Sequence, residues 1–318
     1  MAKFSFKDFR TRYRALSLLN LAGAGISFLA IAALLIIAQR PAYAQQDAFR
    51  RAVELSQAGK AHDAELAWRQ LAQTHPQNAE VHLGLGMALA QQGSLPEAAR
   101  EYRKALTLNP KLRGVSFNLG LAEFKQGNFA AAIKPLAAAA KENPQDKRSG
   151  LLIGMSYFGL HNYAKAAPYL QEAAAAQPSN LELHNVLAQS CLWSAQYACA
   201  MAEYEAILKA DPDSVQAHML LGQALDSLDK RTEAIAELET AARIAPHEPN
   251  VHFELGYLYF TNHDYEHAAP QFELELKNNP DHAQALTYLG DIKIRNNDDK
   301  AAETLLSRAI QLQKNIRL

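Results

Sequence analysis

Histidines are the residues of this chain whose type and spacing most readily suggest chemistry. Four of them are separated by multiples of 34 residues: His82, His184, His218 and His252. Imidazole is a common metal ligand, so such a column could suggest a metal centre. In a helical stack, however, equal places in successive units are two helix spacings of about 8–10 Å apart. A metal–ligand bond is only about 2 Å long, so we expect the column to be structural.

A second histidine pair, His263 and His267, lies one helical turn apart, with Asp264 and Glu266 beside it. A zinc site in a protein usually needs three or four ligands, and no third ligand is evident near this pair. We therefore expect it to be a surface feature, and no metal is predicted anywhere in the chain.

The only two cysteines, Cys191 and Cys199, are eight residues apart. They fall at the end of one expected helix and the start of the next, so the intervening turn brings them close. An oxidising compartment would permit a disulfide, but the geometry of such a bond is strict. Two small buried thiols remain the alternative.

Catalytic motifs are missing from the sequence. It contains no Gly-x-Ser-x-Gly, no phosphate-binding Gly-x-x-x-x-Gly-Lys and no His-Glu-x-x-His. We therefore predict that the protein is not an enzyme and needs no cofactor. Beyond residue 44 the chain has 26 basic and 32 acidic side chains, a net charge of -6, and this mild acidity argues against a nucleic-acid partner.

The elements that must position these residues follow one period. Seven prolines lie 34 residues apart: Pro76, Pro110, Pro144, Pro178, Pro212, Pro246 and Pro280. A column of small residues keeps the same interval: Ala64, Ala98, Ala132, Ala166, Ala200, Ala234, Ala268 and Ala302. Apolar residues between them recur at helical spacing in two stretches, so each unit is predicted to be two amphipathic helices. Such a hairpin cannot bury both apolar faces alone, so the units must stack.

The pattern resembles the tetratricopeptide repeat (TPR) family, which has a Leu-Gly pair, an aromatic residue, then Ala and Pro at fixed places in every 34 residues. The resemblance covers residues 45–318 and implies an all-α, right-handed superhelical solenoid. Eight repeats are expected: 45–78, 79–112, 113–146, 147–180, 181–214, 215–248, 249–282 and 283–316. The first is degraded, because Arg51 and Ala52 replace its Leu-Gly pair.

Residues 1–44 have the composition of an export segment. They contain six basic residues and one acidic residue, and no charge occurs from Ala15 to Ala38. The order of basic, apolar and small residues is typical of a signal peptide with cleavage between Ala44 and Gln45. The uncharged run is also long enough to span a bilayer, so residues 15–38 could instead remain as a membrane anchor. Either alternative predicts an exported protein, periplasmic or extracellular if the source is bacterial, whose only membrane contact is this segment.

In TPR proteins the first helices of successive repeats line a concave groove. Carried over by position, the groove here would be lined by Leu83, Met87, Phe117, Leu121, Phe124, Leu151, Met155, Phe158, Asn185, Gln189, Gln223, Phe253, Tyr257 and Phe260. The alternative is that many of these residues only pack against neighbouring first helices. The family's carboxylate-gripping set is matched only at Asn118 and Arg148, so we do not expect that activity.

The resemblance therefore implies a non-catalytic scaffold that binds a peptide or helix of a partner protein in the cell envelope. A second hypothesis is an accessory subunit that positions substrate for a membrane enzyme or an export machine, such as one for polysaccharide export or cytochrome assembly. The sequence names neither the partner nor the oligomeric state.

Overall fold

The computed structural model describes residues 46–316, and every regular element in that part of the chain is a helix. The first helix spans residues 46–57. In chain order the others are α3 (Ala61–Thr74), α4 (Ala79–Gln91), α5 (Leu95–Leu108), α6 (Val115–Lys125), α7 (Phe129–Glu142), α8 (Arg148–Gly159), α9 (Tyr163–Ala176), α10 (Leu181–Trp193), α11 (Tyr197–Ala210), α12 (Val215–Ser227), α13 (Arg231–Ile244), α14 (Val251–Thr261), α15 (Tyr265–Asn278), α16 (Ala283–Arg295) and α17 (Asp299–Ile316).

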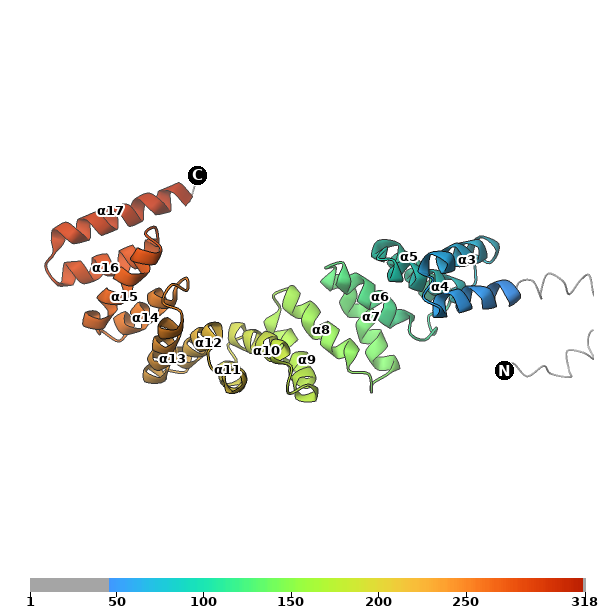
Figure 1. Cartoon of the computed structure of the whole chain (residues 1–318), viewed down its shortest axis with the longest axis horizontal. Helices are drawn as coiled ribbons and strands as arrows, with labels where there is room; N and C mark the ends of the chain where they lie inside the picture. The colour runs from blue at the N-terminus through green and yellow to red at the C-terminus, as the bar shows by residue number, and fades with distance from the viewer. Residues whose placement is uncertain (1–45, 317–318) are drawn as a thin grey trace, which may run out of the picture.

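The helices stack in pairs along a curved superhelix with its two ends far apart (Figure 1). Each helix contacts the one before it and the one after it in the chain. The odd-numbered helices begin 34 residues apart, from Ala61 to Asp299. This regular stack of helix pairs confirms the predicted all-α solenoid.

The turn between the two helices of each repeat needs one residue with positive φ. Gly59, Gly93 and Gly127 occupy this place in the first three repeats. The next five repeats use residues that carry a Cβ: His161, Ala195, Asp229, His263 and Asn297. Asn, Asp and His adopt the left-handed region more readily than other residues with a Cβ, so the cost of about 1–2 kcal/mol falls mainly on Ala195.

Within a repeat, a glycine lets the two helices approach closely. A Cβ added to Gly86 would lie 2.6 Å from the ring of Tyr102, which is closer than packed carbon atoms allow. The residue at Gly86 must therefore be small, because the large side chain of the second helix packs directly against it.

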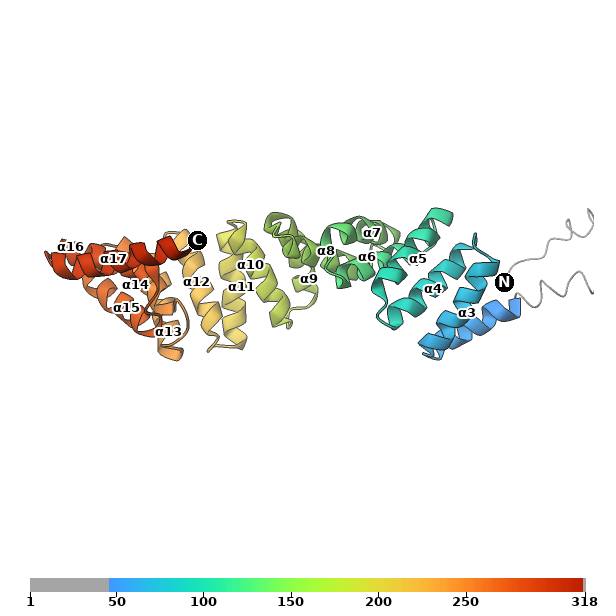
Figure 2. The ribbon, with the colours of Figure 1, turned by 90° about the horizontal axis from the view of Figure 1, so that it is seen from above.

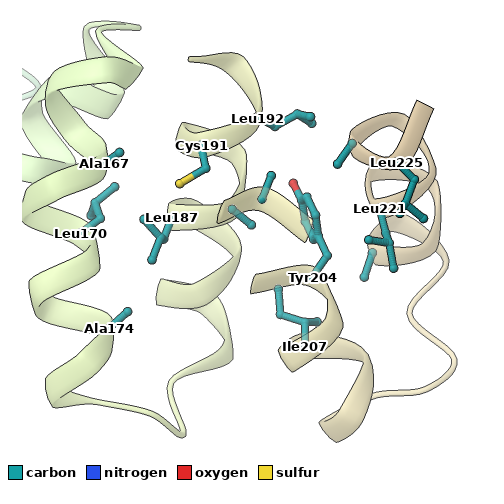
Figure 3. Packing of buried hydrophobic residues seen from close by; sticks show 14 of the residues in the cluster. Ala167, Leu170, Ala174, Leu187, Cys191, Leu192, Tyr204, Ile207, Leu221 and Leu225 are labelled. Carbon is teal, nitrogen blue, oxygen red and sulfur yellow. The ribbon is translucent and has the colours of Figure 1, made fainter. Parts of the chain in front are cut away.

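The core runs through the whole stack as successive buried clusters. Figure 3 shows the cluster in which α9, α10, α11 and α12 meet, with Leu170, Leu187 and Tyr204 pointing into a shared interior. All three side chains are almost fully buried. Each helix pair thus buries its apolar faces against its neighbours, as the period predicts.

The histidines of the 34-residue column connect parts of the stack through contacts of their ring nitrogens. His82 Nδ1 lies 2.6 Å from a carboxylate oxygen of Glu101, and its Nε2 lies 3.0 Å from the carbonyl oxygen of Pro76. His218 makes the same two contacts with Glu237 and Pro212. Each of these rings therefore links the two helices of its repeat to the end of the repeat before.

The same column continues at two further places. His252 contacts the side-chain oxygen of Gln271 at 2.8 Å and the carbonyl oxygen of Pro246 at 3.0 Å. His184 contacts Glu203, but its buried Nε2 has no hydrogen-bond partner among residues 46–316. Among the described residues, His184 therefore lacks the contact that the other three rings make with the end of the preceding repeat.

A disulfide joins Cys191 on α10 to Cys199 on α11, with 5.8 Å between the two Cα atoms. Cys191 is fully buried and lies near Leu187 and Leu192 (Figure 3). The bond ties together the two helices of one repeat, the bridged alternative of the two that the sequence leaves open.

The predicted signal or anchor segment, with its cleavage site at Ala44 and Gln45, lies outside the described residues. None of the helices within residues 46–316 combines the length and the apolar character that crossing a bilayer requires.

Candidate functional groove

The even-numbered helices form the inner layer of the stack. The most extensive contacts between next-nearest helices join α4 to α6, α6 to α8 and α14 to α16. In a curved stack, the layer whose successive helices come closest lies on the inside of the curve. The groove residues expected from the sequence all lie on these inner helices, and Figure 2 labels α4, α6, α8, α10, α12 and α14 along the stack.

In repeats two to four, the inner layer is apolar and partly exposed. Met87 is the most open of the groove residues there, with 42% of its surface exposed. Leu151, Met155 and Phe158 are half-buried and pack against the core cluster below them. These side chains therefore support the stack and still present apolar surface.

A pocket of about 370 Å³ lies at the start of α6 and α8, lined by Arg113, Phe117, Asn118, Glu142 and Arg148 among others. It brings together the two residues that match the family's carboxylate-gripping set. The guanidinium of Arg148, however, pairs with Asp146 at 2.6 Å, and this pair holds the pKa of Asp146 below its usual range.

In repeats five and six, the inner layer is polar. Asn185 accepts a hydrogen bond from Gln189 at 3.2 Å, and Gln223 is exposed. Beside this stretch, Trp193 is 49% exposed and packs its ring 4.8 Å from that of Tyr163. The groove thus changes from apolar to polar with one large aromatic residue at the junction.

Repeat seven is aromatic. The ring of Tyr257 lies 5.4 Å from that of Tyr288, and the ring of Phe260 lies 4.9 Å from it. Phe253 joins the same group at 6.2 Å from Tyr288. Only Tyr257 is exposed, at 38%, so one open ring rests on a packed aromatic cluster.

An acidic side chain accompanies these rings. Burial, followed by the nearby charge of Glu275, raises the pKa of Glu254 on α14 to about 7. Glu275 itself is 1% exposed, and its Oε2 has no hydrogen-bond partner among residues 46–316. Desolvated like charges of this kind mark candidate functional sites as well as strained cores.

The net charge of the repeats changes at the same place in the stack as the polarity of the inner helices. Residues 79–180 contain 11 basic and 7 acidic side chains, a net charge of +4. Residues 181–282 contain 5 basic and 17 acidic side chains, a net charge of -12. The balance over the whole chain conceals this difference between two stretches of equal length.

Two features of these inner helices were not predicted from the sequence. The charge of each half could have been found by summing repeat by repeat. Glu254 could have been found by its column, where the other repeats from the second on have Gly84, Asn118, Leu152, Val186, Leu220 and Tyr288. No other residue of that column is acidic.

A tetratricopeptide repeat family model matches residues 49–113, 113–147 and 253–315, and two further models of the same description match 157–224 and 215–248. No curated protein matches the chain.

The chain is similar to several solved structures. The C-terminal part of a TPR repeat-containing protein from Cytophaga hutchinsonii is 18% identical with a TM-score of 0.53, and the match covers 76% of this chain and 99% of that one. YrrB, described as a TPR protein with an unusual peptide-binding site, is 18% identical with a TM-score of 0.50, over 58% and 95%. MamA from Desulfovibrio magneticus is 21% identical with a TM-score of 0.47, over 53% and 95%.

At 18% identity the Cytophaga hutchinsonii protein and YrrB show the fold alone. The family models add the repeat signature itself and together match most of residues 49–315. With its regular stack of helix pairs, the chain therefore belongs to the tetratricopeptide repeat family.

Proposed function

We propose that this protein is a non-catalytic scaffold of the cell envelope whose inner helices hold an extended peptide or a helix of a partner protein. One observation carries the proposal: apolar side chains of repeats two to four stay partly exposed along one continuous layer, with Met87 the most open. A partner's apolar side chains would bury this surface, which is the usual driving force for peptide recognition in a groove.

The envelope location is supported by the composition of residues 1–44, in which basic, apolar and small residues follow one another in the order of an export segment. The disulfide in repeat five agrees with it, because such bonds persist in oxidising compartments. Mass spectrometry of the protein purified from its native source tests the proposal. An N-terminus at Gln45, or an intact chain in the membrane fraction, is expected, whereas an intact chain in the cytosol would contradict it.

The groove is tested with a single exposed side chain. Peptides that bind the full chain are first selected from a random displayed library, and affinities are then measured by calorimetry. Because Met87 is exposed, Met87→Asp should leave the fold intact while placing a charge where apolar contact is needed. We expect a loss of affinity of about tenfold or more, roughly the effect of a few buried methylene groups.

Leu274→Asp is the matched control. Leu274 is equally exposed, at 41%, but lies on the second helix of its repeat. Its replacement should leave peptide affinity unchanged. Equal losses in the two variants, or the failure of the library to yield any binder, would reject the groove.

A further inference from the structure

Glu254 lies on α14, one of the inner helices, without a counter-charge. Its carboxylate has no hydrogen-bond or ion-pair partner among residues 46–316, and α10, α12 and α14 carry no lysine or arginine. Arg295, on the neighbouring α16, is already engaged, because it donates to Asp291 at 2.9 Å and stacks over Tyr265.

The groups around Glu254 add negative charge and aromatic surface. On the helices next to α14, the acidic residues are Glu237 and Glu239 of α13 and Glu275 of α15 among others, and Tyr288 of α16 packs against Tyr257. Glu237 contacts His218, and Glu239 accepts from Tyr259 at 2.6 Å. At the start of α16, His282 contacts Asn250 at 3.0 Å and its ring stacks on Phe253. The charge of Glu275 is the one that acts on Glu254.

Tyr257 gives this carboxylate an exposed neighbour. It follows Glu254 by three residues, a spacing that places both side chains on adjacent parts of one helix surface. A cation is attracted by the face of an aromatic ring within about 6 Å. A carboxylate and an open ring side by side are therefore complementary to an ammonium or guanidinium group.

We propose that Glu254 and Tyr257 form a subsite that receives one lysine or arginine side chain of the bound partner. The buried, unpartnered oxygen of Glu275 supports this assignment, because a positive charge nearby offsets the desolvation of both carboxylates. The net charge of -12 over residues 181–282 attracts the same kind of partner from a distance. The inference rests on the proposed groove, since it assigns the charge of one residue of its occupant.

The position of the subsite also sets the direction of the partner. Its apolar residues lie over repeats two to four, and its basic residue lies over repeat seven.

Binding of a cation should also depend on pH, because the pKa of Glu254 is raised to about 7. At about pH 6 the free carboxyl is mostly protonated, and a bound cation must displace that proton. Affinity for a basic peptide should therefore rise about tenfold between about pH 6 and about pH 8.

The experiment uses the full chain and the peptides selected above. The probes are the tightest lysine- or arginine-containing peptide and its analogue with norleucine at that residue. We expect the norleucine analogue to bind about tenfold to a hundredfold more weakly at about pH 8. Glu254→Gln should bind the two peptides equally and lose the pH dependence, while Glu205→Gln, which changes an exposed carboxylate on α11, should behave as wild type.

The outcomes separate the two proposals. Binders that depend on Met87 but show no basic residue, or no sensitivity to Glu254→Gln, overturn the cationic subsite and leave the groove standing. The absence of any selected binder overturns both. A norleucine penalty that disappears in Glu254→Gln supports the subsite, whether or not the variant changes the stability of repeat seven.

Discussion

Residues 79–180 and 181–282 are three repeats each, built on the same period, and they differ in almost everything except their cores. The first half has apolar inner helices, a net charge of +4 and glycine at two of its three tight turns. The second has polar and aromatic inner helices, a net charge of -12 and no glycine at these turns. Repetition therefore fixes the scaffold and leaves the inner surface free to diverge. We expect the difference to be one of recognition and local strain rather than of packing.

The largest test compares the two cores directly. Leu136 on α7 and Leu238 on α13 fill the same column and are both almost fully buried. Replacing either with alanine should cost about 2–5 kcal/mol of local stability, because a cavity is left in a packed interior. Hydrogen exchange should show the loss confined to the repeats around each site. Costs that differ by more than about 2 kcal/mol would show that the cores also differ.

A smaller test addresses the unpaired carboxylate of the second half. Glu275 occupies a column in which other repeats have Ala105, Ala139, Ala173, Ile207, Ala241 and Ala309. Glu275→Ala should stabilise repeat seven by about 1–3 kcal/mol, since it removes a buried polar atom without a partner. Hydrogen exchange of α14 and α15 gives the measurement. Ala241→Glu is the reverse control and should destabilise repeat six, and stabilisation by both substitutions would contradict the explanation.

The smallest effect concerns the turns. Ala195 has a φ of 59°, so Ala195→Gly should stabilise repeat five by about 0.5–1 kcal/mol as the strain is relieved. In the first half, Gly127→Ala should destabilise its turn by about 1–2 kcal/mol. Thermal unfolding of the two variants measures both signs. If neither shifts the transition, the turns do not contribute to the difference between the halves.

Most of the fold could be predicted from the sequence, because nearly every repeat has the same residue types at the same places. Proline, alanine and glycine at fixed places predict the helix pairs, and the separation of equal places in a stack argued that the histidines were structural. Their partners were not predicted, since the contact of His82 with Glu101 depends on how two helices face each other. The pairing of Cys191 with Cys199 was not predicted either, because it depends on the distance between two helices.

The groove stays a prediction made by position, and the exposure and ionisation of the side chains on the inner helices were not predicted. Which side chains stay open depends on the neighbouring repeat, as Met87 and Tyr257 show by being exposed where similar residues are half-buried. The ionisation of Glu254 likewise depends on burial and on Glu275, which lies on another helix. Neither can be derived from the spacing of residues along one helix.

The unbroken interval of 34 residues has a consequence for how such a protein can change. Since no insertion disturbs the spacing from Pro76 to Pro280, a unit copied or deleted whole leaves every other unit in register with its neighbours. Duplication of one helix pair would lengthen the molecule by a fixed step and carry its surface chemistry with it. New combinations of binding segments can therefore arise by recombination at the prolines, without a new fold having to evolve.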